Sequence, residues 1–200
     1  VLIPDPELDM DAAGIPEKMA FTIYGKHVAR RLARSGMPLR EALRSVKDHA
    51  DPARKALLAE MEARPVLINR APVLHKFGFM AFRPRLTTDD VIKLSPLVFK
   101  GFNADSDGDQ MNAHVPATDE AVREAYDRLL PSRNLFSPAD IESPIHVFGQ
   151  DFLSGLHAAT AGKPDDGKRP RKTFATKKDV VAALARHEIA LDEAVQILED

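Results

Sequence analysis

Three aspartates alternate with other residues in the segment NADSDGDQMNAHVP, residues 103–116, where Asp105, Asp107 and Asp109 occupy every second position. In an extended strand, residues two apart lie ~6.6 Å from each other and residues four apart ~13 Å. Like charges at such short range repel each other unless something positive lies among them. The segment therefore constrains the fold strongly, because the fold has to bring a cation to these carboxylates.

A shared metal ion would exclude both regular backbone conformations for this segment. Oxygens bound to one Mg²⁺ at ~2.1 Å lie at most ~4.2 Å apart, which a flat strand cannot achieve for all three residues. A helix fails as well, because residues two apart point to different sides. We therefore expect a tight curl, for which Gly108 supplies a residue that readily adopts a positive φ.

The donor set favours a hard divalent cation. Carboxylate ligands without His or Cys favour Mg²⁺, Mn²⁺ or Ca²⁺ over zinc or copper. An EF-hand loop is excluded, because its glycine and glutamate positions, counted from Asp105, hold Gln110 and Pro116. An acidic surface turn that binds no ligand stays open as an alternative, since Asp and Gly are common turn formers.

A carboxylate-bound Mg²⁺ keeps open positions that suit nucleotide phosphates. Phosphoryl-type transfer needs metal ions to activate the attacking hydroxyl and neutralise the leaving pyrophosphate, and cations to hold the substrate. Arg70, in the segment INRAP, is a candidate cation because a guanidinium can contact phosphate or sugar oxygens. A structural role, in which Arg70 donates to loop carbonyls, is the alternative.

The rest of the chain predicts an α+β fold. Residues 1–63 are expected to be mostly helical, with helices over residues 16–36, 39–50 and 52–64. Short segments rich in Val, Ile, Leu and Phe, punctuated by Pro and Gly, predict a compact β unit over residues 64–118. Residues 119–162 are expected to be helical and irregular, beginning with a helix capped by Thr118 and ended by Pro131. Residues 163–200 predict a linker and a tail of two short helices.

Composition excludes several classes of protein. The net charge of −2 gives no global argument for a nucleic-acid partner. The absence of cysteine excludes disulfides and thiolate zinc sites and fits a cytoplasmic location. No apolar run approaches ~18 residues, so we expect no membrane partner. The chain begins with VLIPDPEL, which suggests a piece of a longer protein.

Two segments, RPVLINRAPVLHKFGFMAF and IKLSPLVFKGFNADSDGDQMNAHVP, resemble the catalytic core of the largest (beta-prime) subunit of multisubunit DNA-directed RNA polymerase. The family's hallmark is NADFDGDQM with an NRAP-type segment upstream, and Arg70 and Asn103 lie 33 positions apart, as in the family. The resemblance reaches back to PELDMDAAGIPEKMAF and forward through HVPATDEAVREA and GQDFLSGL. It therefore covers most of the chain.

The resemblance implies a double-psi β-barrel over about residues 64–116, flanked by helical segments, and a nucleotidyltransferase activity. Asp105, Asp107 and Asp109 would hold one catalytic Mg²⁺ tightly, and a second Mg²⁺ would arrive with the incoming nucleoside triphosphate. Arg70 and Asn103 match positions that read the ribose of that nucleotide. The RNA 3′-hydroxyl would attack the α-phosphate and expel pyrophosphate.

The implied partners are the beta subunit and the remaining core subunits, the DNA template, the nascent RNA and the nucleoside triphosphates. The isolated fragment is expected to be inactive, because the family needs a second barrel, a mobile trigger element and a nucleic-acid cleft. Two alternatives stay open. One is a single-chain, two-barrel RNA polymerase, templated by DNA or RNA, and the other is an isolated barrel that binds a metal without catalysing a reaction.

Ser106 departs from the family pattern, which has Phe between the first two aspartates. A side chain at this position should point away from the metal, so the ligands would survive while an apolar packing contact is lost. We therefore expect looser packing behind the loop or a compensating contact elsewhere.

Overall fold

The computed structural model describes residues 1–137, 140–161, 172–190, 193 and 195–198. The chain divides into two compact units, Val1–Gly149 and Gln150–Asp200. The first unit combines helices with a six-stranded sheet, which confirms the predicted α+β class.

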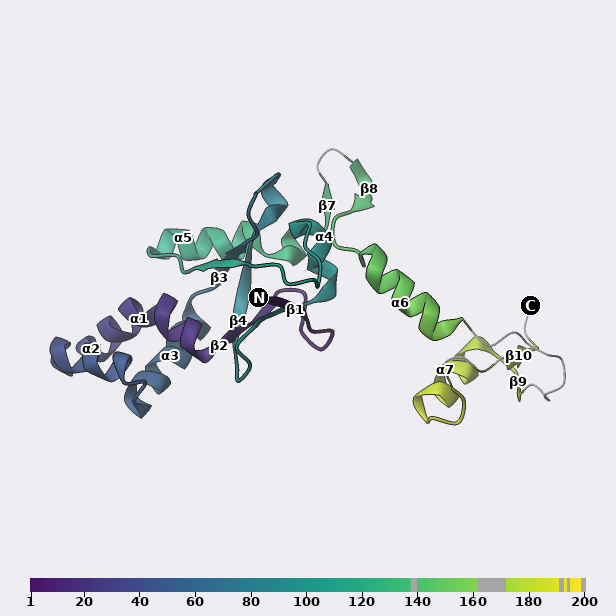
Figure 1. Cartoon of the computed structure of the whole chain (residues 1–200), viewed down its shortest axis with the longest axis horizontal. Helices are drawn as coiled ribbons and strands as arrows, with labels where there is room; N and C mark the ends of the chain where they lie inside the picture. The colour runs from purple at the N-terminus through teal and green to yellow at the C-terminus, as the bar shows by residue number, and fades with distance from the viewer. Residues whose placement is uncertain (138–139, 162–171, 191–192, 194, 199–200) are drawn as a thin grey trace. The chain divides into compact units, whose positions relative to one another are not determined.

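Three helices that follow the first strands confirm the helical predictions for this region. They are α1 (Glu17–Arg34), α2 (Leu39–Lys47) and α3 (Asp51–Ala63), and they pack against one another (Figure 1). The buried side chains of α1 follow the spacing of one helix face and include Phe21, Tyr24, Val28 and Leu32.

A buried carboxylate ties this helical group together. Glu60 of α3 is only 7% exposed and accepts hydrogen bonds from Arg31 Nε at 2.6 Å and Arg64 Nε at 3.3 Å. The hydroxyl of Tyr24 donates to the carbonyl oxygen of Arg64 at 2.9 Å. These contacts fix the end of α3, from which the chain enters the sheet.

The sheet has the strand order β1-β5-β2-β4-β3-β6. Its strands are β1 (Leu2–Pro4), β2 (Ala12–Pro16), β3 (Val66–Asn69), β4 (Phe79–Thr87), β5 (Ile92–Leu94) and β6 (Asn112–His114). The pairs β1–β5 and β2–β4 are parallel, and the other three pairs are antiparallel. Every segment in which we expected a strand between residues 64 and 116 contributes one.

Two strands, β1 and β2, come from the N-terminal region, which was expected to be mostly helical and for which no strand was predicted. All five residues of β2 are buried, and β2 lies between β4 and β5. A Cβ atom on Gly14 would approach Thr87 Cγ2 to 2.8 Å and Lys93 Cβ to 2.9 Å, so the strands fit closely only around a glycine. The sheet is therefore not confined to the segment that begins at residue 64.

The sheet curls so that its two edges approach each other. β1 and β6 are the outer strands. The backbone N–H of Leu2, in β1, donates to the carbonyl oxygen of Asp109, three residues before β6, at 2.9 Å. A flat sheet would hold these edges several strand spacings apart. The sheet is thus a curled half-barrel, and its double-psi connectivity stays a prediction.

Short elements connect and follow the strands. η1 (Lys76–Gly78) precedes β4, while η2 (Pro96–Val98) and α4 (Phe99–Phe102) lead from β5 toward the aspartate segment.

Thr118 caps α5 (Asp119–Glu124) by accepting a hydrogen bond from Ala121 N at 3.2 Å, as expected. The helix continues as the π-helical turn η3 (Ala125–Leu129) and stops before Pro131, which opens η4 (Pro131–Arg133). A hairpin follows, made of β7 (Phe136–Ser137) and β8 (Asp140–Pro144).

The second unit contains α6 (Gln150–Thr160), β9 (Lys172–Phe174), α7 (Lys177–Ala185) and β10 (Val195–Ile197). A capping box between Thr176 and Asp179 starts α7. The second helix expected in the tail is wrong over β10, which pairs with β9 in parallel. Most of the predicted linker, residues 162–171, lies outside the described residues.

In the part of the chain that the structure describes, no helix meets the length and hydropathy needed to cross a membrane.

Candidate metal centre

The aspartate segment forms a loop between α4 and β6. Asn103 ends α4 with φ 50° and ψ 44°, in the left-handed region. Gly108 has φ 118°, which confirms the predicted positive φ. Residues with a Cβ rarely adopt this backbone conformation, so Gly108 allows the chain to bend between Asp107 and Asp109.

The curl brings the three carboxylates to a common point. One oxygen from each of Asp105, Asp107 and Asp109 can be chosen so that all three lie within 4.8 Å of one another. An extended strand would place the first and third residues ~13 Å apart. Asp105 and Asp107 are exposed and Asp109 is partly buried. Small rotations of the two exposed side chains can therefore close the remaining few tenths of an ångström to the ~4.2 Å limit for one Mg²⁺.

The guanidinium of Arg70 forms a bidentate salt bridge with the carboxylate of Asp109. Its Nε donates to Asp109 Oδ2 at 2.7 Å, and its Nη2 donates to Asp109 Oδ1 at 3.0 Å. The backbone N–H of Asp105 also donates to Asp109 Oδ2, at 3.1 Å. Both side chains are largely sheltered, with exposed fractions of 23% for Arg70 and 15% for Asp109. Asp109 is therefore the fixed member of the triad.

Strand pairing explains how residues 39 positions apart in the sequence meet. β3 and β6 run antiparallel, with Asn69 opposite Asn112. Arg70 directly follows β3, and Asp109 lies just before β6, so both leave the sheet at the same end. The sequence identified Arg70 as a candidate cation, but only the register of these strands shows which carboxylate it contacts.

The net charge of the cluster favours a divalent cation. The hydrogen bonds from Arg70 lower the pKa of Asp109, and the same contact raises the pKa of Arg70. A hydrogen bond to Asp105 and the negative charge of that neighbour raise the pKa of Asp107. One guanidinium offsets one of three carboxylates, so a divalent cation would balance the other two. The all-oxygen donor set and this charge fit Mg²⁺, which makes the triad compatible with metal binding.

The other predicted site residues lie around the loop. Asn103, at its start, has an exposed side chain. Ser106 is exposed as well, so a larger apolar residue at this position would also lie at the surface of this chain. The structure thus brings Arg70 and the three aspartates into one cluster, with Asn103 at the edge of the same loop.

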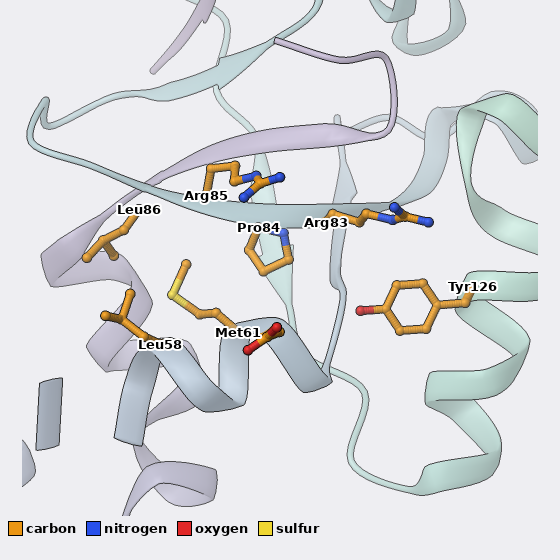
Figure 2. A pocket seen from close by; sticks show the side chains of 8 residues that line it. Leu58, Met61, Arg83, Pro84, Arg85, Leu86 and Tyr126 are labelled. Carbon is orange, nitrogen blue, oxygen red and sulfur yellow. The ribbon is translucent and has the colours of Figure 1, made fainter. Parts of the chain in front are cut away.

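A separate cleft of about 730 Å³ was missed by sequence reasoning. Figure 2 shows its apolar side chains, Leu58, Met61 and Leu86, between α3 and β4, with the hydroxyl of Tyr126 facing them. Arg83 and Arg85 of β4 also line it, and neither forms an ion pair with another described residue. The cleft lies at the opposite end of β4 from Phe79, which pairs with Asn69 next to Arg70. No sequence motif marks it, because its residues come from three distant segments.

Comparisons with known proteins identify relatives over the whole chain. The family model for RNA polymerase Rpb1, domain 2, matches residues 39–130. The chain is 38% identical, over its full length, to DNA-directed RNA polymerase subunit beta′ of Sulfurovum sp. (strain NBC37-1), of which it covers 13%. It is 37% identical, again over its full length, to subunit gamma of Nostoc commune, of which it covers 32%. With subunit beta′ of Salinibacter ruber the identity is 36% over 98% of the chain, which covers 14% of that subunit. The chain thus spans at most about a third of the length of these relatives.

Proposed function

The chain contains a segment of the largest-subunit family of DNA-directed RNA polymerases, and on this premise we propose that it carries the loop that holds the catalytic Mg²⁺ for RNA synthesis. The observation that supports this most directly is the gathering of three carboxylate oxygens within 4.8 Å of one another. Arg70 and the backbone N–H of Asp105 hold only Asp109, so a cation among the three carboxylates would offset the repulsion that remains between them.

Each residue of the cluster has a distinct part in this proposal. Asp105, Asp107 and Asp109 hold the resident ion, and Gly108 permits the bend that brings them together. When bound, this ion and a second Mg²⁺ that arrives with the nucleoside triphosphate supply activation of the RNA 3′-hydroxyl and neutralisation of the pyrophosphate. The aspartates accept no proton in this scheme, since their work is to fix charge and geometry.

Arg70 and Asn103 are proposed to read the ribose of the incoming nucleotide. Arg70 has five N–H donors, of which the contact with Asp109 uses two. No other described residue forms a hydrogen bond with the remaining donors, which could therefore bond sugar hydroxyls. Asn103 offers an exposed amide at the start of the same loop, with both a donor and an acceptor for a hydroxyl. Together they would favour ribonucleotides over deoxyribonucleotides.

The proposed assembly is that of the multisubunit enzyme. The relatives described above are all named as subunits, which favours this form over a single-chain polymerase. We propose that the half-barrel is part of a double-psi β-barrel over about residues 64–116, with added strands from the N-terminal region, and that it pairs with a second barrel of the beta subunit. DNA template, nascent RNA and nucleoside triphosphates would meet there, in the cytoplasm. The domain boundaries predicted from sequence, at residues 63, 118 and 162, remain part of this proposal.

The isolated chain is expected to bind metal without synthesising RNA, because the family needs several further elements for activity. The activity test therefore uses the complete polymerase with this segment in place. Asp109→Ala should abolish extension of an RNA primer on a nucleic-acid scaffold. Glu41→Ala, which removes an exposed carboxylate on α2, serves as the control and should retain extension. Normal extension by the Asp109→Ala enzyme would overturn the proposal.

A further inference from the structure

The hydrogen bonds at Asp109 determine how many oxygens this residue can offer to a metal. A carboxylate has two oxygens with about four lone-pair directions. Oδ2 accepts from Arg70 Nε at 2.7 Å and from the Asp105 N–H at 3.1 Å, so both of its directions are occupied. Among the described residues, Oδ1 accepts only from Arg70 Nη2, at 3.0 Å, and so keeps one lone-pair direction open. Asp109 therefore has one oxygen available as a ligand.

The contact with Arg70 keeps Asp109 in the orientation that offers one oxygen. A planar guanidinium matches the two oxygens of a carboxylate and fixes the plane of the group as well as its position. The pair is sheltered, with exposed fractions of 23% and 15%, so water competes weakly for these hydrogen bonds. Asp105 and Asp107 are exposed, and among the described residues neither forms a salt bridge.

The number of oxygens available matters for the choice of ion. Mg²⁺ requires near-ideal octahedral coordination at 2.0–2.1 Å and takes carboxylates one oxygen at a time. Ca²⁺ accepts 6–8 oxygens at 2.3–2.6 Å and commonly takes both oxygens of a carboxylate. A site whose most fixed carboxylate offers one oxygen thus lacks the bidentate ligand that would favour Ca²⁺.

We propose, on the basis of the proposed metal site, that Arg70 determines which ion binds. Its bidentate contact leaves Asp109 one oxygen to offer as a metal ligand, which disfavours Ca²⁺ relative to Mg²⁺. This role is distinct from reading the ribose, and the five donors of the guanidinium allow both. It is also distinct from a general effect of charge, because removal of a nearby positive charge would strengthen the binding of both divalent ions alike.

The test measures the ratio of Ca²⁺ to Mg²⁺ affinity in the full 200-residue chain. Bound Mn²⁺ is displaced by either ion alone, and the released Mn²⁺ is followed by its paramagnetic resonance signal. Arg70→Lys keeps the charge but replaces the planar donor pair with a point donor, so it isolates geometry from charge. Arg70→Ala removes both. Arg30→Ala, on the exposed side of α1, is the control for loss of one positive charge elsewhere.

We expect both Arg70 variants to shift the affinity ratio toward Ca²⁺ by roughly three- to tenfold, the scale of one additional contact of hydrogen-bond strength. Arg30→Ala should leave the ratio unchanged. An unchanged ratio in folded Arg70→Lys, whatever the absolute affinities, would overturn this inference while leaving the metal site intact. Wild-type affinities that do not respond to Asp107→Ala would instead overturn the metal site itself.

Discussion

The backbone N–H of Leu2 donates to the backbone carbonyl of Asp109 across 2.9 Å, and this bond joins the N-terminal edge of the sheet to the aspartate loop. The side chain of Asp109 is held at the same time by Arg70 and by the backbone of Asp105. The third aspartate is therefore fixed on both its backbone and its side chain, while the other two remain exposed. In the proposed metal site, Asp109 would be the rigid ligand, and Asp105 and Asp107 would adjust to the ion.

The Leu2–Asp109 bond can be removed separately from the packing of Leu2, which is 1% exposed. Leu2→Ala removes the side chain and should lower the free energy of unfolding by about 2–4 kcal/mol. Leu2→Pro also removes the N–H and should cost about 1 kcal/mol more. Only the proline variant should weaken Mn²⁺ binding, measured by titration. Equal Mn²⁺ affinity in both variants would show that the edge bond does not support the loop.

Gly108→Ala should strain the loop without a steric clash. A Cβ at this position would meet nothing within 4 Å, but φ is +118°. We expect a loss of about 1–3 kcal/mol in the free energy of unfolding, together with weaker Mn²⁺ binding as the curl relaxes. Gly155→Ala is the matched control, since it also has open space but lies in the helix α6. There, alanine should stabilise the helix by about 0.5–1 kcal/mol. Identical effects of the two substitutions would contradict the role given to the positive φ.

Glu60→Ala should destabilise the helical group, because it leaves Arg31 and Arg64 without their shared carboxylate. The side chains of the two arginines are 44% and 19% exposed, so water partly replaces the lost contacts. We expect a loss of about 1–3 kcal/mol, measured by denaturant unfolding. Glu62→Ala, two residues further along α3, removes an exposed carboxylate and should change the stability by less than about 0.5 kcal/mol. A larger effect from Glu62→Ala than from Glu60→Ala would refute the assignment.

The stability of the first unit should fall in mild acid because of His146. Both of its ring nitrogens are buried, and burial lowers its pKa from the usual value. The unfolded chain therefore binds a proton at a higher pH than the folded chain does. The contribution of His146 to the free energy of unfolding is therefore fully present above ~6.5, its pKa in the unfolded chain. It is lost as the pH falls toward the lower pKa in the folded chain, and the free energy of unfolding changes by at most about 1.4 kcal/mol per pH unit. His27, whose pKa burial also lowers, adds in the same direction.

His146→Gln should flatten this dependence in unfolding curves recorded between pH 7 and pH 5. His114→Gln, at an exposed position of β6 in the same unit, is the control and should leave the slope as it is. A slope that is the same in wild type and His146→Gln would mean that other groups account for the loss in acid.

Local patterns in the sequence predicted the features that depend on neighbouring residues. The spacing of the aspartates requires a curl, and Gly108 adopts the positive φ that the curl needs. Thr118 caps α5, and the three helices before residue 64 form where their apolar spacing and prolines indicated. These features depend on steric and hydrogen-bonding rules that act over a few residues.

Features set by distant pairing were not accessible from sequence. β1 and β2 are too short for a clear alternation, and β2 is buried on both faces, so only the sheet shows that they are strands. The Arg70–Asp109 contact depends on the register of β3 against β6. In the tail, β10 forms by pairing with β9, more than 20 residues earlier, where local propensity favoured a helix.

The most direct test of the account is a calorimetric titration of the full chain with Mn²⁺, compared with Asp107→Asn. This substitution keeps the size of the side chain and removes the charge from one ligand, while Asp48→Asn does the same to an exposed carboxylate after α2. We expect one Mn²⁺ per wild-type chain, with affinity at least about tenfold weaker in Asp107→Asn and unchanged in Asp48→Asn. Equal affinity in wild type and Asp107→Asn would contradict the proposal that the three aspartates hold a common ion.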